Sequence, residues 1–270
     1  MKRMPTVYMP HGGGPCFFME WDPPHEWDRM AAYLRRLPMD IGASPSAIVL
    51  VSAHWEEEKV TVQSTPNPGL LFDYYGFPPH TYELSYPAPG APELAARMLT
   101  LLKDNGIVAG EDRRRDFDHG VFVPLLLAMP AADVPIAQIS LRADLDPAAH
   151  IAVGAALAPL RDENVLILGS GMSYHNMQML MSSRARGGRP LPEMAPFDEW
   201  LRETATDADP ERRNRRLIDW ERAPGARFAH PREEHLIPLH VIAGAAGEDR
   251  GRETYRDIAM GAPISAYQFG

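Results

Sequence analysis

Two short runs of consecutive apolar residues constrain the fold of this chain most strongly. Residues 47–51 and 165–168 are apolar throughout, whereas a strand with one wet face alternates polar and apolar side chains. Strands that are apolar on both faces belong to sheets covered on both sides, and such sheets are largely parallel because helices connect their strands. The sequence therefore predicts an α/β fold with a central, mostly parallel mixed sheet and helices on both faces.

The remaining elements follow from periodicity and from turn residues. Further strands are expected at 6–9, 134–141 and 264–269, and helices at 25–37, 92–104, 121–129, 147–161, 196–206 and 231–246. The irregular stretch 66–92 is too long for an idle connector, and 182–196 is predicted to be a mobile loop. Neither stretch is a convincing boundary, so we expect residues 1–270 to form a single domain.

Charge and cysteine content exclude several classes of partner. The formal net charge is -9, and the arginine clusters at 113–115 and 212–216 are flanked by acids, which is typical of a solvated face rather than of a nucleic-acid site. Cys16 is the single cysteine, which excludes an internal disulfide and fits a reducing compartment. With no signal peptide and no apolar stretch of membrane-spanning length, we expect a cytoplasmic protein without membrane association.

Three histidines follow predicted strands. His11, His54 and His175 come at or shortly after the ends of three such runs, beside small residues such as the glycines at 12–14 and 169–171. In open α/β sheets the ligand crevice lies beyond the carboxyl ends of the strands, and small residues let the backbone approach a ligand. Taken alone, each histidine is explained as a polar residue with satisfied hydrogen bonds in a strand-to-loop turn. Three histidines at one sheet edge, however, favour a metal site.

Two further histidines have acidic neighbours. Asp118 precedes His119, where it either orients the imidazole for proton transfer or caps the following helix. His235 is expected in the first turns of the last helix, beside Glu233 and Glu234. Adjacent helical residues point about 100° apart, so Glu234 and His235 should not face one metal together, and the two acids also suit the helix dipole.

The other candidates carry less weight. We expect His25 and His150 to be exposed on polar helices and His240 to be a core residue. His80 lies in the irregular stretch, where it is a candidate ligand contact. Cys16 is close to the first histidine, but one cysteine without a partner is weak support for a zinc–thiolate site.

As a whole the pattern resembles the class III extradiol ring-cleavage dioxygenases, of the DOPA 4,5-dioxygenase type, nearly end to end. The motifs that carry the resemblance are, in chain order, His11-Gly12-Gly13-Gly14-Pro15, Val51-Ser52-Ala53-His54-Trp55, Gly76-Phe77-Pro78 with Tyr86-Pro87-Ala88-Pro89-Gly90, Phe117-Asp118-His119-Gly120, Gly169-Ser170-Gly171 through His175-Asn176, and His230-Pro231 through Glu234-His235-Leu236. Each is weak alone, but in this order and spacing they are highly specific. The glycine triplet departs from the shorter glycine–serine turn of some relatives, which leaves the local pocket undefined.

The resemblance implies a mononuclear non-haem Fe(II) enzyme that cleaves a catechol ring beside its hydroxyls and inserts both atoms of O₂. His11 and His54 match two metal ligands, and His235 is the expected third, with Glu234 as the substitute. His175 matches the acid/base histidine and is a further candidate ligand in a zinc-loaded form. His119 matches the second active-site histidine, which would hydrogen-bond a developing oxyanion.

Aromatic side chains in the irregular stretch are natural walls for a planar substrate ring. Tyr75, Phe77 and Tyr82 are the expected substrate contacts, and the alternative is a loop that packs on its own aromatics. The substrate is expected to be DOPA or another substituted catechol, and neither its identity nor the ring bond cleaved follows from the sequence. Loop arginines at 184, 186 and 189 are candidates for binding a substrate carboxylate, although exposed loop charge explains them as well.

Two rival functions use the same residues. A zinc hydrolase would act through a metal-bound water, and the sequence shows no conspicuous general-base carboxylate beside the strand-end histidines. A non-catalytic metal-binding or interaction protein of the same fold would need no proton-transfer pair, whereas this chain has both His119 and His175. A monomer and a homo-oligomer are both compatible with the sequence.

Overall fold

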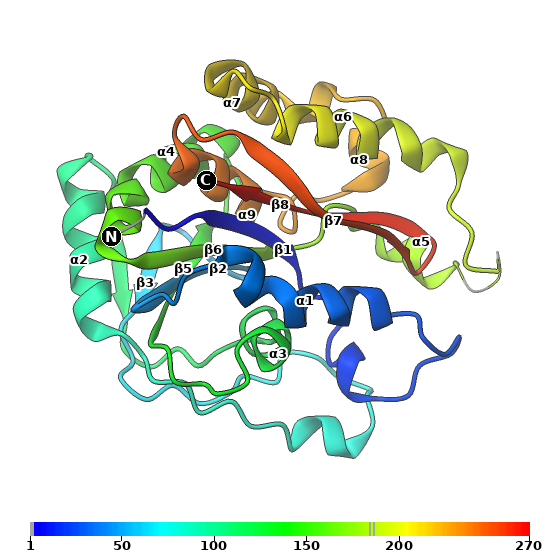
Figure 1. The fold of residues 1–270 in the computed structure, drawn as a ribbon, viewed down its shortest axis with the longest axis horizontal. Helices are drawn as coiled ribbons and strands as arrows, with labels where there is room; N and C mark the ends of the chain where they lie inside the picture. The colour runs from blue at the N-terminus through cyan, green and yellow to red at the C-terminus, as the bar shows by residue number, and fades with distance from the viewer. Residues whose placement is uncertain (1–2, 184, 186) are drawn as a thin grey trace.

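The structure, a computed structural model, describes residues 3–183, 185 and 187–270. Within these residues, eight strands form one sheet with the order β4-β3-β5-β2-β6-β1-β8-β7 (Figure 1). The strands are β1 (Thr6–Pro10), β2 (Ala47–Glu57), β3 (Thr61–Gln63), β4 (Gly110–Asp112), β5 (Ile136–Arg142), β6 (Val165–Gly171), β7 (Gly251–Ala259) and β8 (Ala262–Phe269). The predicted α/β class with a central mixed sheet is confirmed.

The centre of the sheet is parallel and its margins are mixed. Strands β5, β2, β6 and β1 pair in parallel. On one side β8 is antiparallel to β1 and forms a hairpin with β7, and on the other side β3 is antiparallel to β5 and parallel to β4. Leu50 and Leu168, in the central strands, are completely buried, as expected for runs covered on both faces.

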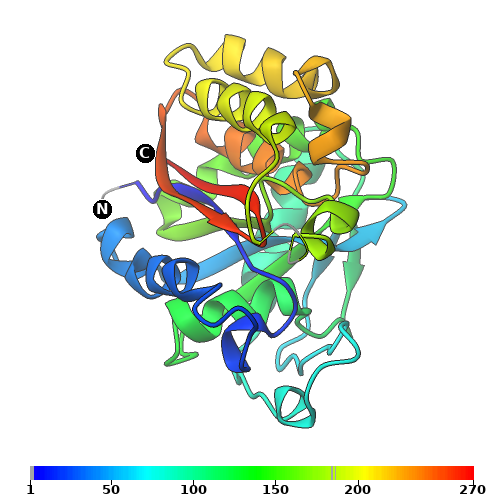
Figure 2. The same cartoon turned by 90° about the vertical axis from the view of Figure 1, so that its right-hand side faces the viewer.

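Helices cover both faces of the sheet (Figures 1 and 2). They are α1 (Asp28–Ile41), α2 (Pro92–Asp104), α3 (His119–Ala128), α4 (Pro147–Leu157), α5 (Met177–Met181), α6 (Ala195–Ala205), α7 (Pro210–Ile218), α8 (Ala226–Ala229) and α9 (Ile237–Ala246). On one face α3 packs on β2 and β6 and against α1, and on the other α9 packs on β6, β1 and β2 and against α4. No helix in the described part of the chain is both long and apolar enough to cross a bilayer.

Two helices begin later than predicted. α1 starts after His25, because His25 adopts a φ of 70°, outside the helical region. α9 starts at Ile237 rather than at residue 231, because residues 231–236 form turns. His235 therefore lies outside the helix, and the helical argument that separated His235 from Glu234 is wrong.

Several elements differ from the prediction because their sequences lack a clear apolar period. α7 was not predicted because its buried side chains are only Arg213 and Leu217. β7 was not predicted because none of the residues between its two ends is fully buried, and β3 and β4 are very short. The helix predicted at 147–161 ends at Leu157 and continues as a 3₁₀ segment over Ala158–Glu163.

The structure also shows the exposure of three histidines outside the predicted site. His25 is exposed and His240 is completely buried, as predicted. His150 is 1% exposed, so the prediction that it is exposed is wrong. The His150 Nδ1–H donates to the Asp146 carbonyl oxygen at 2.7 Å and its Nε2 accepts from the Arg142 backbone N–H at 3.0 Å, which satisfies a neutral imidazole inside the fold.

Candidate metal centre

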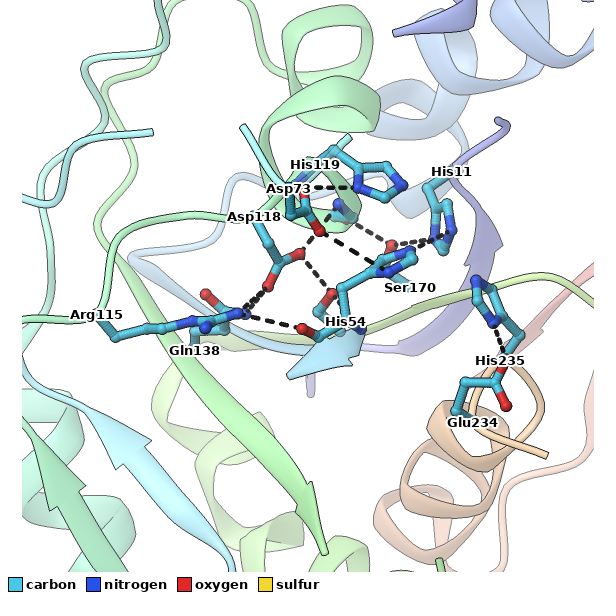
Figure 3. Close-up of polar contacts among 12 residues, drawn as sticks. His11, His54, Asp73, Arg115, Asp118, His119, Gln138, Ser170, Glu234 and His235 are labelled. Atoms are coloured by element: carbon cyan, nitrogen blue, oxygen red, sulfur yellow. Dashed lines mark hydrogen bonds and ion pairs between the residues drawn. The ribbon is translucent and has the colours of Figure 1, made fainter. Parts of the chain in front are cut away.

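The five histidines of the predicted site gather beyond the carboxyl ends of the central strands, and Figure 3 shows His11, His54, His119 and His235. His11 directly follows β1 and His175 comes after β6, whereas His54 lies inside β2, which continues beyond it. The pairing of β2 with β5 shifts register between Val51 and Glu56. Irregularities of this kind redirect side chains near functional sites. His54, whose ring faces His11, lies within this one.

His11, His54 and His235 form the centre of the cluster. The Nε2 atoms of His11 and His54 lie 3.1 Å apart. The ring centroid of His235 is 5.2 Å from that of His11 and 4.9 Å from that of His54. One nitrogen from each of the three rings lies within 4.8 Å of the other two. Three distant segments of the chain thus present their ring nitrogens to one point.

These donor atoms fit a divalent transition metal such as Fe(II) or Zn(II). Burial, reinforced by the neighbouring imidazoles, lowers the pKa of His11, His54 and His235 well below the ordinary histidine value. The rings are therefore neutral at pH 7 and keep the lone pairs that metal coordination requires. Imidazole nitrogen suits both iron and zinc, so the donor set does not choose between the two metals.

A hydroxyl fixes the tautomer of His11. The Ser170 hydroxyl donates its single hydrogen to the Gly120 carbonyl oxygen at 2.5 Å, so its oxygen accepts from the His11 Nδ1–H at 3.0 Å. The proton of the neutral imidazole is therefore on Nδ1, and the Nε2 lone pair faces His54. Metal-binding histidines usually have such an outer partner, which orients the ring.

The backbone of His235 is anchored to the sheet beneath the cluster. Its carbonyl oxygen accepts from the Tyr8 hydroxyl at 2.8 Å and from the Met172 backbone N–H at 3.1 Å. A Cβ at Gly171 would lie 2.2 Å from the same oxygen, so only glycine allows β6 to approach this turn. β1 and β6 thereby fix the position of a residue that lies far from both in sequence.

Glu234 and His175 stand beside His235. The rings of His175 and His235 are stacked with centroids 3.4 Å apart. Glu234 Oε1 lies 2.8 Å from His235 Nδ1 and 3.1 Å from His175 Nδ1. Burial alone would raise the pKa of Glu234, but the hydrogen bond from His175 and the nearby Arg232 hold that pKa below its ordinary value, so the carboxylate is ionised.

His119 and Asp73 occupy the opposite side of the cluster. The His119 ring lies 3.9 Å from the His54 ring between centroids, and its Nδ1 donates to Asp73 Oδ1 at 2.8 Å. Asp73 Oδ2 is 3.9 Å from His54 Nδ1. Burial alone would raise the pKa of Asp73, but the hydrogen bond from His119 and electrostatic interactions with the His119 and His54 rings lower it below its usual value. Asp73 thus faces two of the five histidines.

Asp118 lies under the cluster as a completely buried carboxylate. It accepts from the Ser52 hydroxyl at 2.6 Å, the Gly120 backbone N–H at 3.0 Å, the Gln138 amide at 2.5 Å and the Arg115 guanidinium at 3.0 Å (Figure 3). The predicted capping role of Asp118 is confirmed, because it is the N-cap of α3. Its other contacts join α3 to β2 and β5, and none of its hydrogen bonds goes to the His119 ring.

The predicted substrate contacts pack mainly within their own loop. Tyr75 is 89% exposed, and the Tyr82 ring packs against Phe72 and Tyr74. The Phe77 ring packs against Tyr74, and a Cβ at Gly14 would lie 3.0 Å from it. Of the three predicted contacts, Phe77 therefore reaches the glycine turn that follows His11.

Three other candidates lie away from the five histidines. His80 is exposed and its Nε2 donates to the Phe18 carbonyl oxygen at 3.0 Å. Cys16 is buried, which raises the pKa of its thiol, and it does not belong to any group of converging metal-binding donors among the described residues. Arg189 is exposed, and the predicted positions 184 and 186 lie outside the described residues.

Sequence reasoning missed several side chains that complete the site. Ser170 lay inside a motif that was valued only for its glycines. Asp73 and Tyr8 carry no sequence signal, because an acid in an irregular loop and a tyrosine in a strand are both ordinary. Gln138 is a polar residue in the middle of an apolar strand, 0% exposed, and this is the one feature that could have revealed a buried hydrogen-bond network in advance.

Known proteins resemble this chain over most of its length. Residues 5–269 match the family described as the catalytic LigB subunit of aromatic ring-opening dioxygenase. The chain is 39% identical to the protein named Dioxygenase tasH of Hapsidospora irregularis, with 100% of this chain and 86% of that protein covered. It is also 39% identical to the 4,5-DOPA dioxygenase extradiol of Beta vulgaris, with 83% of each covered.

Bacterial relatives extend the same comparison to structure. The 4,5-DOPA dioxygenase extradiol of Escherichia coli K12 is 31% identical, with 90% of this chain and 85% of that protein covered. The crystal structure of an uncharacterized Escherichia coli K12 protein is 29% identical and superposes with a TM-score of 0.80, covering 99% of this chain and 100% of that one.

Proposed function

Because this chain belongs to the LigB family of aromatic ring-opening dioxygenases, we propose that it is an Fe(II)-dependent extradiol dioxygenase. Its substrate would be a catechol, DOPA-like or otherwise substituted, and both atoms of O₂ would enter the product. The observation that carries the proposal is the convergence of three neutral imidazoles, flanked on opposite sides by two further histidines that each face a carboxylate.

In this proposal His11, His54 and His235 hold the metal through one ring nitrogen each. Bound Fe(II) would supply open coordination positions for the two catechol oxygens and for O₂, and it would lower the pKa of a coordinated hydroxyl. With His11, His54 and His235 holding the ion, the coordination positions not taken by these side chains would be free for substrate. Zn(II) also fits the three imidazoles, but it is redox-inactive and would not support the reaction with O₂.

The two flanking histidines would move and hold protons. With its Nδ1–H donated to Glu234, His175 has an Nε2 lone pair that can accept the second catechol proton and return it later. His119 donates its Nδ1–H to Asp73, so it needs a second proton, on Nε2, before it can donate to a developing oxyanion. The Asp73 carboxylate would balance the charge of that imidazolium.

A zinc hydrolase is the competing function, and one structural observation favours it. Asp73 and Glu234 stand beside the cluster, although the sequence showed no conspicuous carboxylate beside the strand-end histidines and indicated Glu234 only as a substitute ligand. Both are occupied by histidine Nδ1 atoms, which fits an orienting role better than that of a free general base. A non-catalytic metal-binding protein gains no support, because it would need neither His119 nor His175 beside the ligands.

The test is to load metal-free protein with Fe(II) without oxygen, then add air and a panel of catechols. We expect O₂ consumption that matches the growth of a yellow ring-opened product. Absence of product from every catechol, together with ester or amide hydrolysis by the zinc-loaded protein, would refute the dioxygenase and support the hydrolase.

Variants assign the roles within the site. His11→Ala or His54→Ala should lose the metal together with activity. His175→Ala or His175→Phe should keep most of the metal and lose turnover by roughly 10²–10⁴-fold, the usual contribution of an acid–base group. The exposed His25→Ala is the control and should change neither property. Full turnover by metal-loaded His175→Ala would show that His175 is not the acid–base group.

We also propose Tyr75, Phe77 and Tyr82 as contacts of the substrate side chain, with Phe77 the strongest of the three because it reaches Gly14. The single cysteine, Cys16, supports a cytoplasmic location. Monomeric and homo-oligomeric forms both agree with the proposal.

A further inference from the structure

Glu234 contacts two imidazoles through the same oxygen atom. Its Oε1 lies 2.8 Å from His235 Nδ1 and 3.1 Å from His175 Nδ1. The two rings are stacked, with an angle of 18° between their planes. Figure 3 shows the carboxylate below the His235 ring, on the side away from His11 and His54. One carboxylate oxygen therefore meets the same edge of two parallel rings.

This arrangement determines where the protons lie. A carboxylate oxygen without a proton only accepts hydrogen bonds, and Glu234 Oε1 lies within hydrogen-bonding distance of both Nδ1 atoms, so both donate to it. In a neutral imidazole the other nitrogen then carries the lone pair. Because the rings are stacked almost in parallel and share the acceptor at Nδ1, their Nε2 atoms both point away from Glu234. On His235 this lone pair lies on the side of His11 and His54 (Figure 3).

Glu234 is itself held in place from outside the cluster. Arg232 lies 3.5 Å from Glu234 Oε2 and also forms a two-pronged ion pair with Glu56, near the end of β2. The carboxylate side chain is only 14% exposed. The strand that carries His54 is thus connected through Arg232 to the carboxylate that orients His235.

We propose that Glu234 is a positioning residue that sets the tautomers of His235 and His175 together, so that one side chain prepares a metal ligand and the neighbouring proton acceptor. This inference rests on the proposed function for the role of His175. It also gives Glu234 a task other than binding the metal held by His11, His54 and His235, since its oxygen lies at the Nδ1 edge of His235. With His175 and His235 it forms a separate group of converging donors, and the test below distinguishes the two roles.

The variants Glu234→Ala and Glu234→Gln test the proposal, with Glu233→Gln as the matched control. Glu233 is adjacent to Glu234, and its substitution by glutamine removes the same charge. Its carboxylate, however, pairs with Arg227 at 2.6 Å, outside the cluster. Thermal unfolding of each variant shows whether it is folded. The near-isosteric glutamine variant keeps the test valid if the alanine variant does not fold.

The first measurement is the dissociation constant of Zn(II), obtained by competition with a chelator. We expect binding to weaken about 10–100-fold in Glu234→Ala, the usual effect of removing an outer partner of a ligand. The loss should be smaller in Glu234→Gln, because an amide oxygen still accepts hydrogen bonds, and Glu233→Gln should match the wild type. Complete loss of metal in Glu234→Gln would show that Glu234 is itself a ligand and would overturn the proposal.

The second measurement is ¹⁵N NMR of the histidine rings in the metal-free protein, which distinguishes the two neutral tautomers. We expect Nδ1–H on His175 and His235 in the wild type and in Glu233→Gln, and a shift of His175 toward Nε2–H in Glu234→Ala. Unchanged tautomers together with unchanged zinc affinity would also overturn the proposal. Neither measurement involves catechol turnover, so failure to cleave any catechol refutes the proposed function and leaves these two results to decide the role of Glu234.

Discussion

Removal of the Asp118 carboxylate should destabilise the whole fold as well as the site. The side chain is completely buried and accepts four hydrogen bonds, from Ser52, Gly120, Gln138 and Arg115. In Asp118→Ala the Ser52 hydroxyl and the Gln138 amide lose this acceptor inside the protein. Arg115, whose side chain is 17% exposed, can partly turn to water.

The loss in the free energy of unfolding can be estimated from these contacts. Breaking a buried ion pair by removing one partner typically costs 3–5 kcal/mol, and loss of a helix N-cap costs about 1 kcal/mol. Since Arg115 is partly solvated and the terms overlap, we expect about 4 kcal/mol for Asp118→Ala. Asp118→Asn keeps an oxygen for the cap and for Ser52, but it places an NH₂ group near Arg115, so we expect about 2 kcal/mol.

Urea unfolding at pH 7.5, followed by circular dichroism, measures these differences in the free energy of unfolding. The matched control is Asp116→Ala, two positions earlier, whose carboxylate accepts from the Gly69 backbone N–H at the surface; it should cost below about 1 kcal/mol. If Asp118→Ala costs no more than Asp116→Ala, the buried network does not stabilise the fold as argued. Zinc affinity should fall as well, because α3 carries His119 and the Gly120 carbonyl that orients Ser170.

Two further predictions concern single side chains. Ser170→Ala removes the acceptor of the His11 Nδ1–H and should weaken zinc binding about 10-fold in a chelator competition; an unchanged affinity would show that the hydroxyl does not orient the ligand. Burial lowers the pKa of His240 to about 4, below the unfolded value of about 6.5, so protonation favours the unfolded chain and stability falls as the pH drops below about 6.5. Between pH 7.5 and pH 5 this residue alone should lower the free energy of unfolding by about 2 kcal/mol. Urea unfolding of the metal-free protein at the two pH values should therefore show a loss about 2 kcal/mol smaller in His240→Gln than in the wild type. Equal losses would contradict the burial argument.

The parts of the fold that could be predicted are those whose sequences carry a strong period. The apolar runs around Leu50 and Leu168 predicted the parallel centre of the sheet, because only strands covered on both faces read that way. α7 could not be found in the same way, since Arg213 is buried through hydrogen bonds to backbone carbonyls of the α9 end rather than through apolar contact. Tertiary partners of this kind leave no local pattern.

In the candidate site, too, only the residues with a local sequence signal could be predicted. Its five histidines could be proposed from the sequence: His11, His54 and His175 because they follow predicted strands, and His119 and His235 because they have acidic neighbours. The family resemblance supplied the role of His235 as the third ligand. The residues that orient them could not be proposed, because Ser170, Asp73 and Glu234 act through contacts that only the folded chain creates. The helical period assumed around His235 led to the argument that Glu234 and His235 would not face one metal together, but residues 234–236 form a turn in which the two side chains contact each other.

The two carboxylates beside the cluster give an independent reason to expect a divalent cation there. The three central imidazoles are neutral, since burial depresses the pKa of each. Asp73 and Glu234 remain ionised because histidine Nδ1–H groups bind them and lower their pKa values. A dication at the centre would face two negative charges at the flanks, of which Glu234 already has Arg232 as a partner 3.5 Å away, whereas Asp73 has histidine partners. Both carboxylates are partly exposed, and opposite charge close to them lowers their electrostatic energy, so a dication at the centre of the site would improve its charge balance.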